Sequence, residues 1–162
     1  MKIWYMNGAG NDFMVMDARG GAYDFEALAK ELCGRTGADG FMATDVSENA
    51  DFRLHFYNAD GSRGEMCGNG SRCICRFAYD NGIAGSFMTV RTDAGLVYGK
   101  RLAEDRYQVR LNVPSVLELQ QPRFLESIHL KAVQPFQNLL ERQRTGQCQQ
   151  VKELALPCGK AC

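Results

Sequence analysis

The residues best suited to chemistry form the run Glu65 to Arg72, EMCGNGSR, where Cys67 stands just ahead of a helical pattern. A thiol in the last residues before a helix lies near the positive end of the helix dipole and near unpaired backbone N–H groups, which favour the thiolate. Gly68 and Gly70 carry no side chains, so a carboxylate could approach the backbone around Asn69 closely. The run predicts a carboxylate-binding loop that holds a reactive thiol. The alternative is a buried structural cysteine in a tight turn.

Two asparagines lie in turns that could bring them to this loop. Asn11 follows the predicted loop Asn7 to Gly10, and Asn58 opens a predicted turn shortly before Cys67. Asn58 could bind the ligand that Cys67 attacks, but a turn asparagine bonded only to its own backbone fits the spacing equally well. His55 lies on the polar face of an alternating strand, so we interpret it as a solvated or edge histidine outside the site.

The elements that must position these residues form a β-rich sheet wrapped on one helix. Alternation and turn signals predict strands at Lys2–Met6, Phe13–Asp17, Phe41–Thr44, Asp51–Asn58, Phe87–Thr92, Leu96–Lys100 and Tyr107–Val113. A first helix is expected from the N-cap Asp24 through Cys33, ended by Gly34. A second is expected from Ser71, with Gly82 after its last turn, so the candidate loop lies at a helix N-terminus.

Length and composition are those of a globular domain. The chain has 162 residues, of which 45% are hydrophobic and 23% charged. Its 19 basic and 19 acidic side chains cancel, and no basic stripe interleaves with aromatic residues, which argues against nucleic acid and favours a small-molecule partner. No apolar run has the length of a signal peptide or a membrane span, so we expect no membrane contact and a cytoplasmic location.

The seven cysteines do not suggest disulfides or a metal site. Their count is odd and no export signal is seen, so disulfides are not the default. The spacing of Cys67, Cys73 and Cys75 differs from the C-x2-C pairs of structural zinc sites, and we therefore expect no metal. Cys33, Cys73 and Cys75 are interpreted as packed thiols on helices.

The chain changes character after residue 117. Of its 17 glycines, 15 precede residue 114, whereas all four prolines follow residue 113. We therefore expect one domain at residues 1–117 and an atypical tail at 118–162 that is disordered or frame-shifted. Within the tail, Ile128–Glu141 could form a weakly amphipathic helix, and Gln143–Gln150 is expected to be irregular.

Residues 1–117 closely resemble the N-terminal half of diaminopimelate epimerase, a racemase family that uses no pyridoxal phosphate. The matching motifs stand in the family's order: GAGNDF at Gly8–Phe13, GADG at Gly37–Gly40, DFRLHFYNADGSRGEMCGNGSRC at Asp51–Cys73 and TDAG at Thr92–Gly95. The resemblance implies an α+β fold of two similar halves, each a curved mixed β-sheet wrapped around a central helix. This chain matches one of those halves.

The resemblance also implies roles for individual residues. Cys67 matches the family's first catalytic cysteine, Gly68 and Asn69 match the backbone that holds the substrate's reacting carboxylate, and Asn11 and Asn58 match substrate-binding asparagines. The implied activity is cofactor-independent epimerisation of LL- and meso-diaminopimelate, for lysine biosynthesis, by proton transfer between two cysteines that face each other across the α-carbon. A homodimer is considered for the assembly.

Two departures from the family's pattern leave alternatives open. Gly40 stands where the family often has a polar residue, so that position receives no role. The family's second half should supply a Glu-Arg pair and a second cysteine in a loop like ACGTG, and the sequence around Cys158 is only a faint echo of that loop. The chain could thus be an inactive half-enzyme that only binds or associates. Another racemase of the fold, such as proline racemase, is a further alternative, but it typically shows CGHG where this chain has Asn69.

Overall fold

The computed structural model describes residues 1–65 and 67–111 and the backbone of Arg144–Leu154. In these residues the strands are β1 (Ile3–Gly8), β2 (Asn11–Asp17), β3 (Gly40–Asp45), β4 (Phe52–Asn58), β5 (Phe87–Thr92), β6 (Gly95–Arg101), β7 (Arg106–Arg110) and β8 (Arg144–Leu154). The helices are α1 (Phe25–Thr36) and α2 (Gly68–Asp80). The predicted strands are confirmed to within a few residues. The last part of the strand predicted to end at Val113 lies outside the described residues.

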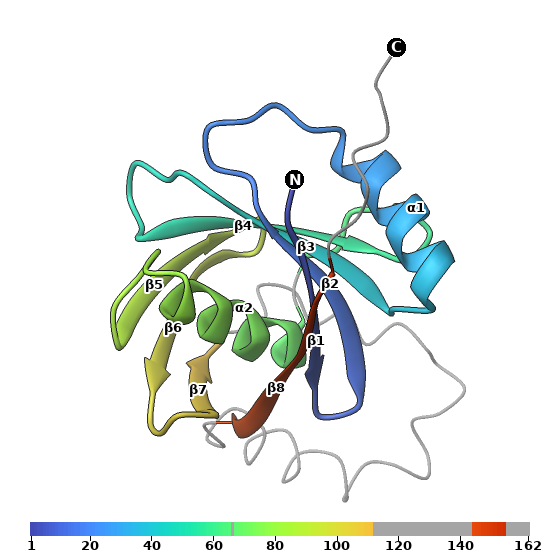
Figure 1. Ribbon diagram of the computed structural model, residues 1–162. Helices are drawn as coiled ribbons and strands as arrows, with labels where there is room; N and C mark the ends of the chain where they lie inside the picture. The colour runs from blue at the N-terminus through green and yellow to red at the C-terminus, as the bar shows by residue number, and fades with distance from the viewer. Residues whose placement is uncertain (66, 112–143, 155–162) are drawn as a thin grey trace, which may run out of the picture.

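The strands close a barrel in chain order around helix α2 (Figure 1). β2 pairs with β3 and β4 with β5 in parallel, whereas the other neighbours pair antiparallel. Helix α1 packs on the outside, against β2, β3 and β4. The predicted curved mixed sheet around a central helix is therefore confirmed.

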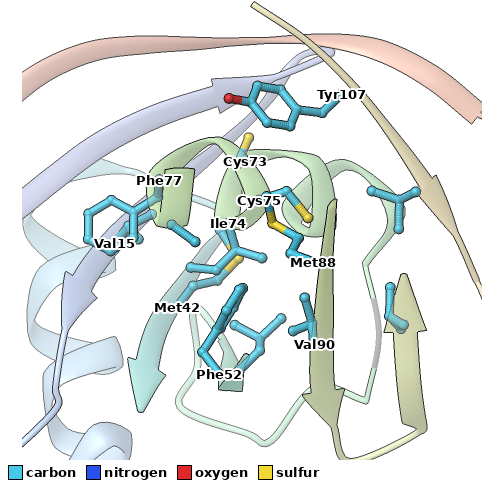
Figure 2. Packing of buried hydrophobic residues seen from close by; sticks show 14 of the residues in the cluster. Val15, Met42, Phe52, Cys73, Ile74, Cys75, Phe77, Met88, Val90 and Tyr107 are labelled. Atoms are coloured by element: carbon cyan, nitrogen blue, oxygen red, sulfur yellow. The ribbon is translucent and has the colours of Figure 1, made fainter. Parts of the chain in front are cut away.

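Alternation along β2 explains the two layers of the core. Phe13 and Val15 point inward to the cluster around α2, while Met14 and Met16 point outward to the cluster under α1. Figure 2 shows the inner cluster, in which Ile74 of α2 lies beside side chains of the surrounding strands. Because both faces of this part of the sheet are covered, the register of β2 is fixed on both sides.

Both helices differ from their predicted bounds at one end. Helix α1 continues past Gly34 and ends at the C-cap Gly37, which takes the left-handed conformation at φ 74° and donates its N–H to the Cys33 carbonyl at 2.8 Å. Helix α2 begins at Gly68 rather than at Ser71. The earlier start makes Cys67 the N-cap itself, so the prediction that the loop lies at a helix N-terminus is confirmed.

Strand β8 corrects the description of the tail. Its backbone pairs antiparallel with β1 on one side and with β7 on the other. The expected disorder of residues 118–162, and the irregular structure expected at Gln143–Gln150, are therefore wrong for Arg144–Leu154. The reason is that β1 and β7 offer backbone N–H and C=O groups, and pairing with these does not require an alternating apolar pattern. The predicted helix Ile128–Glu141 and Cys158 lie outside the described residues, and the domain boundary at residue 117 stays a prediction.

Candidate functional site

Cys67 caps the N-terminus of α2. Its backbone is extended, at φ −134° and ψ 117°, and its Sγ accepts a hydrogen bond from the Gly70 N–H at 3.4 Å. Its carbonyl oxygen accepts from the N–H of Ser71 at 2.7 Å and from the Ser71 hydroxyl at 2.8 Å. Serine, threonine, aspartate or asparagine usually fills this position. Here a sulfur atom stands where a capping oxygen is normally found.

Two backbone N–H groups of the same helical turn have no acceptor among the described residues. Within the described part of the chain, the N–H groups of Gly68 and Asn69 donate to no hydrogen-bond acceptor, whereas the next two donate to Cys67. Among the described residues, a Cβ placed on Gly68 would meet only the Leu111 side chain, at 3.8 Å. Unpaired N–H groups at the positive end of a helix dipole favour an anion. The geometry thus supplies two donors next to the Cys67 sulfur.

The β1–β2 hairpin holds this turn in place by close backbone approach. A Cβ on Gly8 would lie 2.6 Å from Cys73 Sγ and 3.0 Å from the Asn69 carbonyl oxygen, so only glycine fits there. The two turn residues, Ala9 and Gly10, have positive φ angles of 53° and 93°, as a tight hairpin requires. The hairpin thereby brings Asn11, the first residue of β2, to the first turn of α2.

A chain of hydrogen bonds joins Asn11 and Asn69 to two charged residues. Asn69 Nδ2 donates to Asn11 Oδ1 at 2.7 Å, and Asn11 Nδ2 donates to Asp39 Oδ2 at 3.2 Å. At the other end, Arg72 Nη2 donates to Asn69 Oδ1. Sequence reasoning assigned no role to Asp39 or Arg72, although both stand inside the quoted GADG and CGNGSR motifs. The structure therefore brings Asn11 and Asn69 together beside Cys67 and adds two side chains to them.

Asn58 lies outside this hydrogen-bond chain. Its Nδ2 donates to Ser62 Oγ at 2.9 Å, and its N–H donates to the Ser62 carbonyl at 2.8 Å. It pairs with Gly40 at the end of β4, and within the described residues it forms no hydrogen bond to Cys67, Asn11 or Asn69. Its bonds are thus those of a turn asparagine, and a role in substrate binding stays a prediction.

The other cysteines with described side chains are packed in the core. Cys33, Cys73 and Cys75 are buried, whereas Cys67 is half-exposed. Burial raises the pKa of Cys33 to about 11, with a smaller contribution from the Asp39 charge. Cys33 is therefore a neutral thiol at physiological pH, and the prediction that these three are packed thiols is confirmed.

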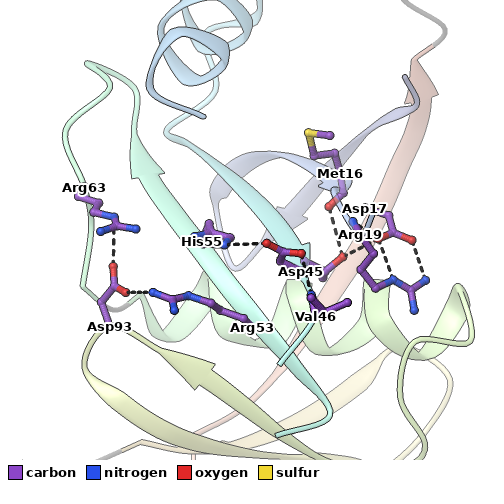
Figure 3. A network of polar contacts seen from close by, with 10 residues as sticks. Met16, Asp17, Arg19, Asp45, Val46, Arg53, His55, Arg63 and Asp93 are labelled. Atoms are coloured by element: carbon purple, nitrogen blue, oxygen red, sulfur yellow. Dashed lines mark hydrogen bonds and ion pairs between the residues drawn. The ribbon is translucent and has the colours of Figure 1, made fainter. Parts of the chain in front are cut away.

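His55 is held on the outer face of the barrel, under α1 (Figure 3). Its ring stacks on Phe25 with centroids 4.7 Å apart, and its Nε2 lies 3.3 Å from Asp45 Oδ2. The solvated alternative for His55 is wrong, because α1 covers this side of β4, whereas the edge alternative is not contradicted, since β4 pairs with β5 only at Phe52 and Arg53. Burial lowers the pKa of His55, so the ring is neutral near pH 7. In this position it serves packing, and among the described residues it forms no hydrogen bond or ring contact with the Cys67 loop.

The described residues do not contain a metal cluster or a membrane span. No group of three or more His, Cys, Asp or Glu side chains among them is arranged to hold a metal ion. Neither described helix combines the length and the apolar character needed to cross a bilayer.

Comparison with known protein families shows which family the chain belongs to. The family model of diaminopimelate epimerase matches residues 3–115, which is more than half of the sequence. The chain belongs to the diaminopimelate epimerase family. The diaminopimelate epimerase of Caldanaerobacter subterraneus subsp. tengcongensis is 43% identical over 109 residues, covering 65% of this chain and 39% of the relative. That of Aquifex aeolicus is 37% identical over 130 residues, covering 71% of this chain and 47% of the relative. This family member thus spans less than half the length of these curated relatives.

Solved structures share the fold of this family member. A phenazine biosynthesis protein of the PhzF family from Bacillus anthracis superposes with a TM-score of 0.55 at 18% identity, covering 68% of this chain and 40% of that one. A probable proline racemase from Agrobacterium radiobacter K84 gives a TM-score of 0.56 at 15% identity, covering 68% and 41%. At such identities the likeness shows the fold alone.

Proposed function

We propose that this chain carries one half of a cofactor-independent diaminopimelate epimerase site, in which the first turn of α2 binds the substrate's α-carboxylate and Cys67 transfers the α-proton. The observation that carries the proposal is the placement of the Cys67 sulfur beside two backbone N–H groups that have no acceptor in the described residues. Family membership supports diaminopimelate as the substrate and lysine biosynthesis in the cytoplasm as the setting. A homodimer stays a prediction.

The reaction needs stabilisation of negative charge on the carboxylate. When the Cys67 thiolate removes the α-hydrogen as a proton, the C–H bonding electrons move toward the carboxylate and give an enediolate-like anion. Donors fixed in advance at the place where this charge develops lower the barrier, and a single such donor is typically worth about 10²- to 10³-fold in rate. In this proposal, the N–H groups of Gly68 and Asn69 are those donors.

The same helix end also holds the Cys67 sulfur in place. The Gly70 N–H donates to the sulfur, and the positive end of the α2 dipole lies next to it. Ser71 holds the Cys67 carbonyl through two hydrogen bonds, which fixes the backbone that carries the sulfur. The loop thus positions both the base and the carboxylate donors without a cofactor.

A second candidate function follows from the number of cysteines at the site. Inversion of the α-carbon requires an acid on the face opposite the base, and Cys67 is the half-exposed cysteine among those with described side chains. The chain covers 39–47% of the two relatives described above. We therefore propose that this chain by itself binds the substrate and exchanges its α-proton slowly, without rapid epimerisation.

Substrate protection of Cys67 tests the proposed carboxylate site. The chain is treated briefly with iodoacetamide in the presence of increasing meso-diaminopimelate, and labelling of Cys67 is followed by mass spectrometry. Cadaverine, which has the same two amines and no carboxylate, is the matched control. The proposal expects that diaminopimelate slows the labelling and cadaverine does not. Equal effects of the two compounds, or no effect of either, would show that this loop does not bind the carboxylate.

A further inference from the structure

Arg72 is a buried charge that stability alone does not explain. Arg72 belongs to α2, is 4% exposed, and donates from Nη2 to Asn69 Oδ1. Its Nε is buried and has no hydrogen-bond partner among the described residues. A buried guanidinium with an unsatisfied N–H costs free energy that an apolar side chain of the same shape would not. The buried guanidinium of Arg72 is therefore better explained by a role in the candidate site than by a contribution to stability.

The two ends of the hydrogen-bond chain fix its direction. A guanidinium can only donate, so the atom of Asn69 that faces Arg72 must be its oxygen, and the Asn69 amide nitrogen then faces Asn11. A carboxylate can only accept, so the atom of Asn11 that faces Asp39 must be its nitrogen. Reversing either amide would place two donors or two acceptors against each other.

This fixed direction leaves one defined donor on each asparagine. Each side-chain amide uses one of its two N–H groups and one lone pair within the chain, and the second N–H is left for another acceptor. We propose that Arg72 and Asp39 are positioning residues that lock the amides of Asn69 and Asn11 in the one orientation that offers N–H groups to a ligand carboxylate at the α2 N-terminus. The choice of a carboxylate rests on the proposed function.

The atoms used by Asp39 provide a conservative variant. The same Oδ2 accepts from Asn11 Nδ2 at 3.2 Å and from the Asp12 N–H at 2.8 Å. Because both donors converge on one oxygen, Asp39→Asn can keep both bonds with its amide oxygen, whereas Asp39→Ala keeps neither. Rescue by asparagine therefore separates the loss of an acceptor from the loss of a charge.

The test reads the Asn11 and Asn69 amides directly by NMR. The side-chain N–H signals of both asparagines are assigned in a ¹⁵N-labelled sample of the whole chain and compared among wild type, Arg72→Met, Asp39→Ala and Asp39→Asn. The Asn11 signals are expected to shift in Arg72→Met, although Arg72 does not touch Asn11, and the Asn69 signals are expected to shift in Asp39→Ala. Asp39→Asn should stay close to wild type, and Arg72→Met should unfold at no lower denaturant concentration than wild type.

Arg76→Met is the matched control, since it makes the same change on the same helix and removes an ion pair with Asp80 instead. It should leave the Asn11 signals unchanged.

In the Cys67 protection assay, half-protection should require about 2- to 10-fold more diaminopimelate in Arg72→Met and Asp39→Ala, as expected for one lost hydrogen bond each. If diaminopimelate does not protect Cys67 in the wild-type chain, the proposed carboxylate site is wrong. The NMR comparison still tests the positioning role of Arg72 and Asp39 in that case. Unshifted Asn11 signals in Arg72→Met, or a failure of Asp39→Asn to restore the wild-type signals, would overturn the positioning role.

Discussion

Replacement of Gly8 by alanine should lower the stability of the fold and displace the first turn of α2, which forms the candidate site. Gly8 ends β1, and an added Cβ would lie 2.6 Å from Cys73 Sγ and 3.0 Å from the Asn69 carbonyl oxygen. The carbonyl belongs to the first turn of α2, so it can yield only if the turn moves. Overpacking of this kind costs about 1–3 kcal/mol. For a chain of this size, each kcal/mol lowers the melting temperature by about 2–4 °C.

Gly99→Ala is the matched control for this substitution. A Cβ there would lie 2.5 Å from Cys75 Sγ, and its other close neighbours are atoms of the Met88 side chain, the nearest at 2.9 Å. The overlap with a buried α2 cysteine is thus as severe as in Gly8→Ala, but Gly99→Ala makes no close contact with the backbone of the first turn of α2. Both variants should unfold at a lower temperature than wild type, and only Gly8→Ala should also slow iodoacetamide labelling of Cys67.

Either of two results would contradict this role of Gly8. Wild-type stability of Gly8→Ala would show that the hairpin and α2 do not approach as closely as described. A loss of stability with wild-type labelling of Cys67 would show that the first turn of α2 does not govern the thiol. The double variant Gly8→Ala/Cys73→Ala should lose less than the sum of the two single variants, because it removes the sulfur contact and leaves the contact with Asn69.

Two further predictions concern titrating side chains. Cys67 should be alkylated first among the cysteines with described side chains, because it is half-exposed while Cys33 is buried with a pKa of about 11; first labelling of Cys33 would contradict this. Burial lowers the pKa of His55, so the stability that neutral His55 contributes is fully present above its unfolded pKa and declines as the pH falls below that value. The stability difference between wild type and His55→Gln should therefore shrink between about pH 7 and pH 5 in denaturant titrations, and a constant difference would refute it.

Local features of the site were predictable from the sequence. Cys67 stands directly ahead of a helical pattern and between glycines, and these neighbours suffice to place it at a helix N-terminus. The contact between Asn11 and Asn69 joins residues 58 positions apart, and periodicity contains no information about it. The resemblance to a family assigned both residues to one site, but it did not predict the hydrogen bond between them.

Other features depend on tertiary structure that no local pattern reveals. The role of Arg72 depends on α2 running inside a closed barrel, where even a charged residue on the helix becomes buried. The alternation of β4 predicts a solvated or edge position for His55, because that pattern contains no information about the packing of α1 over β4. The backbone of Arg144–Leu154 pairs with two strands despite a polar sequence, because ladder hydrogen bonds are common to all residues except proline.

Deuterium incorporation at the α-carbon tests most directly whether Cys67 is the base that transfers the α-proton. LL- and meso-diaminopimelate are incubated in heavy water with the purified chain, with Cys67→Ala and with buffer, and both deuterium content and stereochemistry are measured. We expect slow incorporation that requires Cys67, with inversion slower than incorporation, because inversion also needs an acid on the face opposite Cys67, and such a group typically contributes about 10²- to 10⁴-fold. Incorporation that is equal in wild type and Cys67→Ala would contradict the role of Cys67. Rapid Cys67-dependent epimerisation would show that this chain supplies a second acid of its own.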